Sequence, residues 1–391
     1  MSLRIGFVST YQPTRCGLAT FTSALLSALT APGEVEVKAE VLRLVTGPDL
    51  TRSDAPEVVA ELDIADANGV RQAAASLDSV DVAVVQFEYG IFGGHDGEQA
   101  ISLLQHLQVP AVVVLHTVLL HPTPHQRVVL EQVSALADAV VVMTETARRW
   151  LAAGYRVDPH KVVTIPHGAG GPVHGDDTAA SLVPAERWPS GAGPAAPTIL
   201  TWGLIGPGKG IEWGIDAVAR LADLDPRPRY VVAGQTHPKV RERDGERYRH
   251  FLERRAVDRH VSDQVVLDDR YRDKAALASL VSSADVVLLP YDSREQISSG
   301  VLIEAVAAGV PVVATRFPHA VELLESGAGL LVDQQSPAQM AAGLRSVLTD
   351  AGLAARMRAA SVAIGGSVSW PAVAVAYRQV MDRLASSRLS A

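Results

Sequence analysis

Short apolar runs alternate with helical segments along the first half of the chain. The runs lie at residues 4–10, 35–45, 80–90, 110–117, 138–144 and 161–168, and nearly all of them end in a polar residue or a glycine. Continuous apolar runs with helices between them are typical of parallel strands that are covered on both faces. The pattern therefore predicts a doubly wound α/β domain.

The alternation is interrupted once and then resumes. Residues 181–197 are rich in Pro, Gly and Ala and have no periodicity, which is typical of a linker. Six more apolar runs follow, and a helix with Pro371 at its start comes last. We therefore predict an N-terminal domain at 1–180, a linker at 181–197, a C-terminal domain at 198–369 and a terminal helix at 370–391. Ligands of such folds bind outside the carboxyl ends of the strands, so the loops there should carry the chemistry.

Composition narrows the class of partner. The chain of 391 residues has 48% hydrophobic residues, 20% charged residues and a net charge of −8. This acidic balance argues against nucleic acid, because neutralising phosphates requires an excess of Lys and Arg. The single cysteine, Cys16, excludes an intrachain disulfide and a cluster of thiolate ligands. We see no signal-peptide pattern and no apolar run of about 18 residues, so we expect a cytoplasmic protein without a membrane span.

Three loops of the first half carry candidate residues. Gly17 opens the helix after the first strand, where free amide groups suit a phosphate or a sugar hydroxyl. Glu88 ends an apolar run and begins a loop that contains Gly93 and Gly94, and His116 ends another run. Each has a plain structural alternative: a turn glycine, a solvated surface loop and a hydrogen-bonded core histidine.

A glycine loop opens the second half. The segment TWGLIGPGKGIEWGIDAVARL at 201–221 predicts a strand, a loop and a helix, with Gly206 and Lys209 in the loop. It does not fit a P-loop, because Gly210 follows the lysine where Ser or Thr is required. A fixed cation beside free amides at a helix start nevertheless suits a diphosphate. The alternative is a solvated lysine.

A second polar loop precedes an apolar helix. Residues 291–299 contain Arg294, Glu295, Gln296 and two serines in one run, and the helix that follows carries Glu304. Along the sequence, no pair of His or Cys has the spacing of metal ligands, so we predict no metal.

A resemblance to the retaining GT-B glycosyltransferases of family 4 is carried by the second-half segments GLIGPGKGIEWGIDAVARL and ADVVLLPYDSREQISSGVLIEAVAAGVPVVATRFPHAVELL. The first-half segments STYQPTRCGLATFTSALLSAL, QFEYGIFGGHDG, LHTVL and IPHG are similar to one bacterial branch of that family. The resemblance implies an α/β GT-B fold, in which two Rossmann-like domains face a central cleft and the terminal helix packs back on the first domain. It also implies a nucleotide sugar as co-substrate, held mainly by the second domain, without a cofactor or an essential metal.

The resemblance also implies roles for the second polar loop. Glu304 matches the second glutamate of the family's E-x7-E motif, which typically binds the nucleotide ribose, and carboxylate oxygens grip vicinal hydroxyls well. Ser299, Gly300 and Val301 would turn backbone amides toward the diphosphate, and Gly206 belongs to the glycine loop beside it.

Two positions depart from the family pattern. Gln296 stands where the first motif glutamate is expected, with Glu295 next to it, so either residue could contact the hydroxyls of the donor sugar. Leu204 stands where the family usually has an arginine, which leaves more of the diphosphate charge to the lysine of the glycine loop. Arg270 or Arg294 would compensate.

The implied function is the transfer of a hexose, of mannose or glucose type, from a nucleoside-diphosphate sugar with retention of configuration. The acceptor would be a carbohydrate, a small molecule or a lipid-linked compound, and the last of these leaves peripheral membrane contact open. Lys209, His116 and Glu295 are the predicted catalytic residues, with Lys209 stabilising the leaving diphosphate and His116 contacting the donor sugar. The acceptor side is predicted to comprise Gly17, Glu88, Gly93 and Gly94. Two alternatives remain: a nucleotide-sugar epimerase on the same scaffold, and a non-catalytic module that binds sugar nucleotides.

Overall fold

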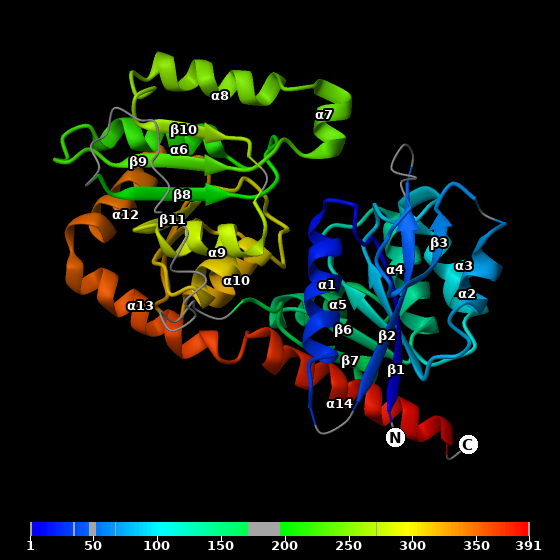
Figure 1. Ribbon diagram of the computed structural model, residues 1–391. Coiled ribbons are helices and arrows are strands. Elements are labelled where there is room, and N and C mark those ends of the chain that lie inside the picture. Colours follow the sequence, from blue (N-terminus) through cyan, green and yellow to red (C-terminus); the bar gives the residue numbers. More distant parts are fainter. Residues whose placement is uncertain are drawn as a thin grey trace. The chain divides into compact units, whose positions relative to one another are not determined.

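The computed structural model describes residues 2–33, 36–46, 52–66, 68–170, 196–270 and 272–389 (Figure 1). Contacts within the chain define two compact units: unit 1 comprises Met1–Gly168 and Trp370–Ala391, and unit 2 comprises Ala169–Ser369. Most of the predicted linker at 181–197 lies outside the described residues. Residues 169 and 170, which the sequence prediction placed in the first domain, belong to unit 2, where the amide of Ala169 donates to Val368 O at 2.8 Å.

Unit 1 is built on a parallel seven-stranded sheet with the order β3-β2-β1-β4-β5-β6-β7. Its strands are β1 (Leu3–Ser9), β2 (Val37–Val45), β3 (Val58–Asp63), β4 (Val82–Phe87), β5 (Ala111–Leu115), β6 (Ala139–Val142) and β7 (Val162–Thr164). Every residue of β4, β5 and β6 is buried. This burial explains the uninterrupted apolar runs, because helices cover both faces of the sheet.

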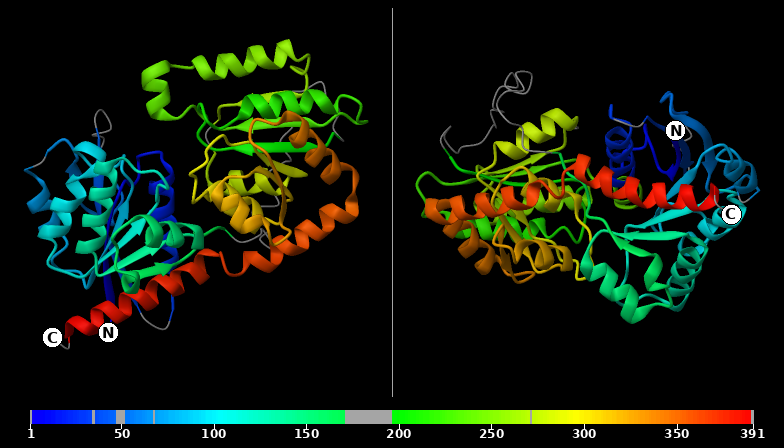
Figure 2. Two further views of the ribbon diagram at one scale, coloured as in Figure 1. Left: turned by 180° about the vertical axis from the view of Figure 1, so that it is seen from behind. Right: turned by 90° about the horizontal axis from the view of Figure 1, so that it is seen from below.

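The helices of unit 1 come from both ends of the chain. They are α1 (Gly17–Leu29), α2 (Val70–Ala75), α3 (Gln99–His106), α4 (Pro124–Leu136), α5 (Glu145–Gly154) and α14 (Trp370–Leu389), with short 3-10 turns η1 (His95–Gly97) and η2 (Pro159–Lys161). Helix α14, red in Figure 2, packs against α1. Phe21 and Leu25 of α1 share one buried cluster with Val373 and Tyr377 of α14. The last helix of the chain is therefore part of the core of unit 1.

Unit 2 is built on a parallel six-stranded sheet with the order β10-β9-β8-β11-β12-β13. Its strands are β8 (Thr198–Trp202), β9 (Arg229–Ala233), β10 (Val265–Asp268), β11 (Val286–Leu289), β12 (Val312–Thr315) and β13 (Gly329–Val332). Its helices are α6 (Ile211–Val218), η4 (Ala219–Leu221), α7 (Pro238–Asp244), α8 (Arg247–Asp258), α9 (Lys274–Ser282), α10 (Gly300–Ala307), α11 (Pro318–Leu324), α12 (Pro337–Thr349) and α13 (Ala351–Gly365). Alternate residues of β8 enter different cores: Ile199 packs in one buried cluster and Leu200 in the other.

Both sheets reverse their strand order at one point. In unit 1 the reversal lies between β1 and β4, and in unit 2 it lies between β8 and β11. Crossovers leave such a point in opposite directions, which opens a crevice between the loops beyond the two strand ends. The segments after β8 and β11 hold most of the predicted donor residues, and Arg270 follows β10. The loops after β1 and β4 hold the predicted acceptor residues.

Candidate active site

The glycine loop after β8 has a backbone that only glycine adopts readily. Gly203, Gly208 and Gly210 have φ values of 117°, 88° and 63°. A Cβ atom on Gly210 would lie 1.9 Å from Pro290 O, so a side chain is sterically excluded there. The amide of Asp292 donates to Gly208 O at 3.0 Å, which ties this loop to the loop after β11. The two loops at the reversal point of unit 2 therefore form one connected structure.

Lys209 is the cation of the glycine loop. Its Nζ lies 4.2 Å from the centroid of the Tyr291 ring, a cation–π distance, and the ring is itself stacked on Phe317. Burial lowers the pKa of the Lys209 ammonium. In the described part of the chain no carboxylate forms an ion pair with it. A partly desolvated cation with an aromatic neighbour and no carboxylate partner is well suited to an anionic ligand.

Glu304 belongs to the same region. It lies in the second turn of α10, and its Oε2 accepts a hydrogen bond from Trp202 Nε1 at the end of β8, at 3.4 Å. Burial raises the pKa of Glu304, and the hydrogen bond from Trp202 opposes that rise. Because a carboxylate beyond the first turn gains little from the helix dipole, capping does not explain this residue.

The N-terminus of α10 is held by a buried histidine. The amide of Ser299 donates to Nδ1 of His319 at 2.8 Å, and the Ser299 hydroxyl accepts from the amide of Leu302 at 3.3 Å. Val301 lies against the glycine loop, since its Cγ2 would be 3.5 Å from a Cβ on Gly203. The amides of Gly300 and Val301 therefore start the helix next to the loop that carries the lysine.

The remaining donor-side candidates already have contacts. Gln296 Nε2 donates to Ser298 O at 3.3 Å, within its own loop. Glu295 lies in the same loop, where its amide donates to the hydroxyl of Ser293 at 3.4 Å. Arg270 makes a two-point contact with Asp268, with nitrogen–oxygen distances of 2.9 and 2.7 Å. Their roles toward a donor stay predictions.

On the unit 1 side, the loops after β4 and β5 meet. Glu88 Oε2 accepts a hydrogen bond from the hydroxyl of Thr117, and His116 Nε2 donates to Gln86 Oε1 at 2.6 Å. The His116 ring lies edge-on to Phe21, with centroids 4.9 Å apart. Since the glutamine oxygen only accepts, Nε2 carries the proton of a neutral ring and Nδ1 remains an acceptor.

Two histidines share the Phe21 ring. His167 also lies 4.9 Å from Phe21, and its Nδ1 donates to Gly168 O at 2.7 Å. Burial lowers the pKa of His116 to about 3, with a smaller contribution from the neighbouring His167, and burial lowers the pKa of His167 to about 4. Both rings are therefore neutral near pH 7.

The three glycines predicted for the acceptor side differ in the structural reason that favours glycine at each position. A Cβ on Gly93 would lie 1.9 Å from Ile64 O, so local packing accounts for that residue. Gly94 has a φ of 80°, which favours glycine. A Cβ on Gly17 would meet nothing within 4 Å, so packing leaves Gly17 without an explanation. Gly17 is the first residue of α1, and Cys16 caps this helix: its Sγ accepts a hydrogen bond from the amide of Ala19 at 3.5 Å.

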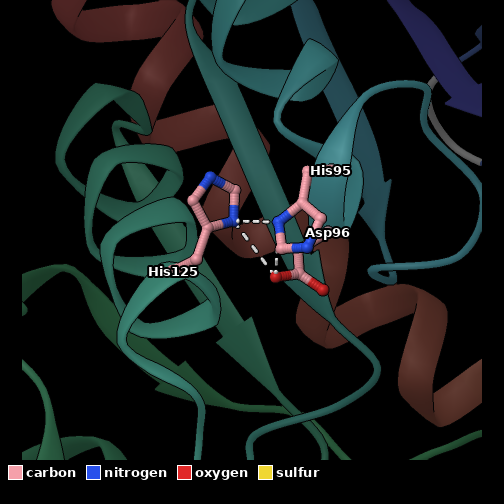
Figure 3. Close-up of side chains that lie close together, drawn as sticks. All are labelled: His95, Asp96 and His125. Atoms are coloured by element: carbon pink, nitrogen blue, oxygen red, sulfur yellow. Dashed lines mark hydrogen bonds and ion pairs between the residues drawn. The ribbon is translucent and has the colours of Figure 1, made fainter.

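The structure also brings together a cluster that spacing along the sequence did not reveal. His95 and Asp96 of η1 lie against His125 in the first turn of α4, and their nitrogen and oxygen atoms converge (Figure 3). His95 and His125 are 30 positions apart, so a search for local metal-ligand spacing misses them. The GGHDG segment was the available signal, as a histidine and an aspartate inside a glycine-rich loop.

Comparison with known proteins decides the family. The sequence profile "Glycosyl transferases group 1" matches residues 183–362, and the profile "Glycosyltransferase Family 4" matches residues 45–169. A D-inositol 3-phosphate glycosyltransferase from Stackebrandtia nassauensis is 31% identical over 321 residues, which cover 78% of this chain and 68% of that protein. The chain belongs to glycosyltransferase family 4. A second D-inositol 3-phosphate glycosyltransferase, from Corynebacterium glutamicum, is 30% identical, and the match covers 58% of its length.

Solved structures show the same fold as this glycosyltransferase. A glycosyltransferase from Rickettsia africae ESF-5 aligns with a TM-score of 0.74 at 14% identity, over 98% of both chains. HepE from Anabaena, in complex with UDP and glucose, aligns with a TM-score of 0.72 at 15% identity, over 98% of this chain and 100% of that one. These matches and the two parallel sheets confirm the predicted GT-B fold. Among the described helices, none has both the length and the apolar character needed to cross a bilayer.

Proposed function

We propose that this glycosyltransferase moves a hexose, of mannose or glucose type, from a nucleoside-diphosphate sugar to a carbohydrate, small-molecule or lipid-linked acceptor with retention of configuration. The observation that carries the proposal is the environment of Lys209. This lysine is a partly buried cation, placed over Tyr291 in a glycine loop at the N-terminus of α6, and it has no carboxylate partner among the described residues. A diphosphate would supply the negative charge that pairs with this ammonium, and the amides at the start of α6 would donate further hydrogen bonds to it.

The geometry supports a division of labour in the donor site. Lys209 and the amides that begin α10 would stabilise the negative charge that develops on the diphosphate as the bond from the anomeric carbon to the phosphate oxygen breaks. The acceptor oxygen would form the new bond on the same face of the sugar. The proton of the acceptor hydroxyl would pass to the departing phosphate oxygen. The reaction therefore needs no covalent intermediate with the enzyme.

Glu304 would bind the ribose. Its carboxylate is raised in pKa by burial, and it gains stabilisation when two vicinal hydroxyls donate to its oxygens. The Trp202 indole already fixes one of these oxygens, which aims the carboxylate before the nucleotide arrives. Glu295 and Gln296 would contact the sugar that the nucleotide carries.

Unit 1 would supply hydrogen-bond acceptors. His116 offers Nδ1 as an acceptor to a sugar hydroxyl, because its Nε2 is committed to Gln86. Glu88, oriented by Thr117, would accept from a hydroxyl of the acceptor. In this scheme Lys209 provides the charge that a metal ion provides in other transferases, so we propose that the transfer step itself needs no metal.

A panel of donors and acceptors tests the proposal. Thermal shifts with UDP-, GDP- and ADP-linked glucose and mannose would first identify the donor. Turnover is then followed by release of the nucleoside diphosphate in the presence of EDTA, with simple sugars and D-inositol 3-phosphate as acceptors. NMR of the product reports the anomeric configuration.

The outcomes separate the alternatives. Release of diphosphate with a product of retained configuration supports the proposal. Conversion of the donor to an epimer without acceptor would instead indicate an epimerase, and binding without turnover of any donor would indicate a binding module. A product of inverted configuration would contradict the same-face mechanism.

A further inference from the structure

Three potential metal-ligand atoms converge in unit 1, where η1 meets the start of α4. Nδ1 of His95 lies 2.8 Å from Nδ1 of His125, and Oδ2 of Asp96 lies 3.2 and 3.1 Å from those two atoms (Figure 3). In a tetrahedral site with metal–ligand bonds of about 2.0–2.1 Å, neighbouring ligand atoms are about 3.3 Å apart. Outward shifts of a few tenths of an ångström would therefore admit an ion between the three atoms.

The backbone is shaped to hold this arrangement. Asp96 has φ 52° and ψ 30°, a left-handed conformation that few residues other than glycine, asparagine and aspartate adopt. It is flanked by Gly94 and Gly97, which also have positive φ, so the loop turns sharply and presents the Asp96 carboxylate to the two imidazoles. His125 comes from a rigid element, the first turn of α4 after its cap at Thr123. Local strain of this kind is often retained where a side chain must point at a ligand.

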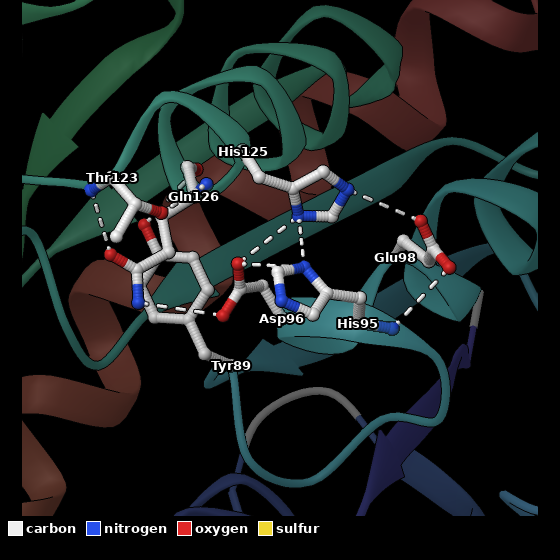
Figure 4. Close-up of polar contacts among 7 residues, drawn as sticks. All are labelled: Tyr89, His95, Asp96, Glu98, Thr123, His125 and Gln126. Carbon is white, nitrogen blue, oxygen red and sulfur yellow. Dashed lines mark hydrogen bonds and ion pairs between the residues drawn. The ribbon is translucent and has the colours of Figure 1, made fainter.

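The neighbours of the three residues hold them as outer-shell groups hold metal ligands (Figure 4). Oε2 of Glu98 lies 3.3 Å from Nε2 of His125, on the far side of that ring from the cluster. This carboxylate favours the proton on Nε2 and so leaves the Nδ1 lone pair directed at the cluster. Oδ1 of Asp96 accepts from Gln126 Nε2 at 3.4 Å, and Gln126 is itself fixed by a capping box with Thr123.

Without an ion, the cluster is not fully satisfied. The Nδ1 atoms of His95 and His125, 2.8 Å apart, form a hydrogen bond only if one of them carries a proton. The other Nδ1 then directs its lone pair also toward Oδ2 of Asp96, which has no proton to donate. An ion that accepts three lone pairs removes this conflict. The donor set, two imidazoles and one carboxylate, favours Zn²⁺ and related transition ions over Mg²⁺ or Ca²⁺, which prefer oxygen ligands.

We propose that His95, Asp96 and His125 bind one Zn²⁺-class ion, with Glu98 and Gln126 as positioning residues. The side chain of His95 is 73% exposed, and those of Asp96 and His125 are 18% and 39% exposed, so the fourth position is open to water or to a ligand atom. The ion would join the loop at 93–98 to α4. This inference goes beyond the proposed function, because the transfer chemistry assigned above does not use the ion.

Calorimetry with the metal alone tests the site. Tag-free, metal-stripped protein is titrated with ZnCl₂ and, separately, with MgCl₂ at the same concentration. We expect one Zn²⁺ per chain at micromolar or tighter affinity and no saturable binding of Mg²⁺. Substitution with Co²⁺ should give visible absorption bands typical of nitrogen and oxygen ligation. Absence of saturable Zn²⁺ binding would overturn the proposal and leave a hydrogen-bonded cluster only.

Matched variants locate the ion. His95→Ala and His125→Ala should each lose most of the binding, whereas His160→Ala, which removes an exposed histidine of η2, should bind as the wild type does. Glu98→Gln should weaken the affinity about ten- to hundredfold, as is usual for an outer-shell partner. Melting temperatures without metal verify that the variants fold. Zn²⁺ binding that survives in both His95→Ala and His125→Ala would contradict the assignment.

Discussion

The loops at the two reversal points differ in how their charged and polar groups are satisfied. In unit 2, Lys209 has an aromatic ring beside it and no carboxylate partner among the described residues. In unit 1, Glu88 of the loop after β4 accepts a hydrogen bond from Thr117, and His116, which follows the neighbouring strand β5, is hydrogen-bonded to Gln86. Under the proposed function, the unit 2 loop would take its countercharge from the bound diphosphate, while the unit 1 loops would present groups that are already oriented by hydrogen bonds. Variants on the two sides should therefore fail in different ways.

The largest effect is expected for Lys209→Ala. Removing one preorganised group that stabilises developing charge typically costs about 3 kcal/mol in the barrier, or more than a hundredfold in turnover. The measurement is the steady-state rate of diphosphate release, together with a melting curve. Lys38→Ala, which removes a 61% exposed lysine, is the matched control and should retain full activity. If the folded Lys209→Ala protein keeps more than about a tenth of wild-type turnover, the assigned role is wrong.

Glu304→Ala should come next and should act on binding. The loss of a charged hydrogen-bond partner is worth roughly 1.5–3 kcal/mol, which corresponds to about ten- to hundredfold in affinity. Calorimetry should show this loss for the bare nucleoside diphosphate as well as for the intact donor. Glu295→Ala and Gln296→Ala serve as the comparison, because they should weaken the donor and spare the diphosphate. Unchanged diphosphate affinity in Glu304→Ala would remove the ribose role.

A smaller effect is expected on the unit 1 side for His116→Asn. A neutral hydrogen bond to a sugar hydroxyl is worth about 0.5–1.5 kcal/mol, so turnover should fall by up to about tenfold. Affinity for the free diphosphate should not change, because His116 is assigned to the sugar. His106→Ala is the control, since His106 bonds to the carbonyl of Ser102 in its own helix. A variant that loses diphosphate affinity would show that the contrast between the two sides is not as described.

The last prediction concerns the dependence of stability on pH rather than activity or binding. The pKa values of His116 and His167 fall from 6.5 to about 3 and about 4 on folding, so between these limits the unfolded chain binds more protons than the folded chain. The free energy of unfolding should therefore decrease as the pH is lowered from about 6.5 toward 4. Scanning calorimetry across this range should show a falling melting temperature. His167→Gln should flatten the dependence, and an equally steep fall in that variant would contradict the assignment.

The two sheets differ in how completely their strands are predicted from the sequence. All six strands of unit 2 coincide with apolar runs, because each is flanked by turns and most are fully buried. In unit 1 the pattern misses β3, at Val58–Asp63, which lies at the edge of the sheet and alternates between more and less exposed residues. Such a strand lacks the continuous apolar run that indicates a central one.

The candidate site is predicted unevenly for a related reason. Loops that follow buried strands are found from the sequence, because strand ends in a parallel sheet share one edge. The environment of Lys209 and the contact of Glu304 with Trp202 depend on tertiary packing between segments that are far apart in the chain. The cluster of His95, Asp96 and His125 needs η1 to lie against α4, which no local spacing encodes.

The place of α14 has a consequence for how the chain is made. A ribosome releases β1 and α1 early, but Val373 and Tyr377, which pack against Phe21 in the finished protein, emerge only after the whole of unit 2. The apolar face of α1 therefore lacks its partner helix until synthesis is nearly complete. Unit 2, in contrast, is formed by one continuous stretch of the chain. Closing so long a loop adds little to the final free energy, because that entropy grows only with the logarithm of length. It does set an order of events, in which unit 2 can complete its core before unit 1 does.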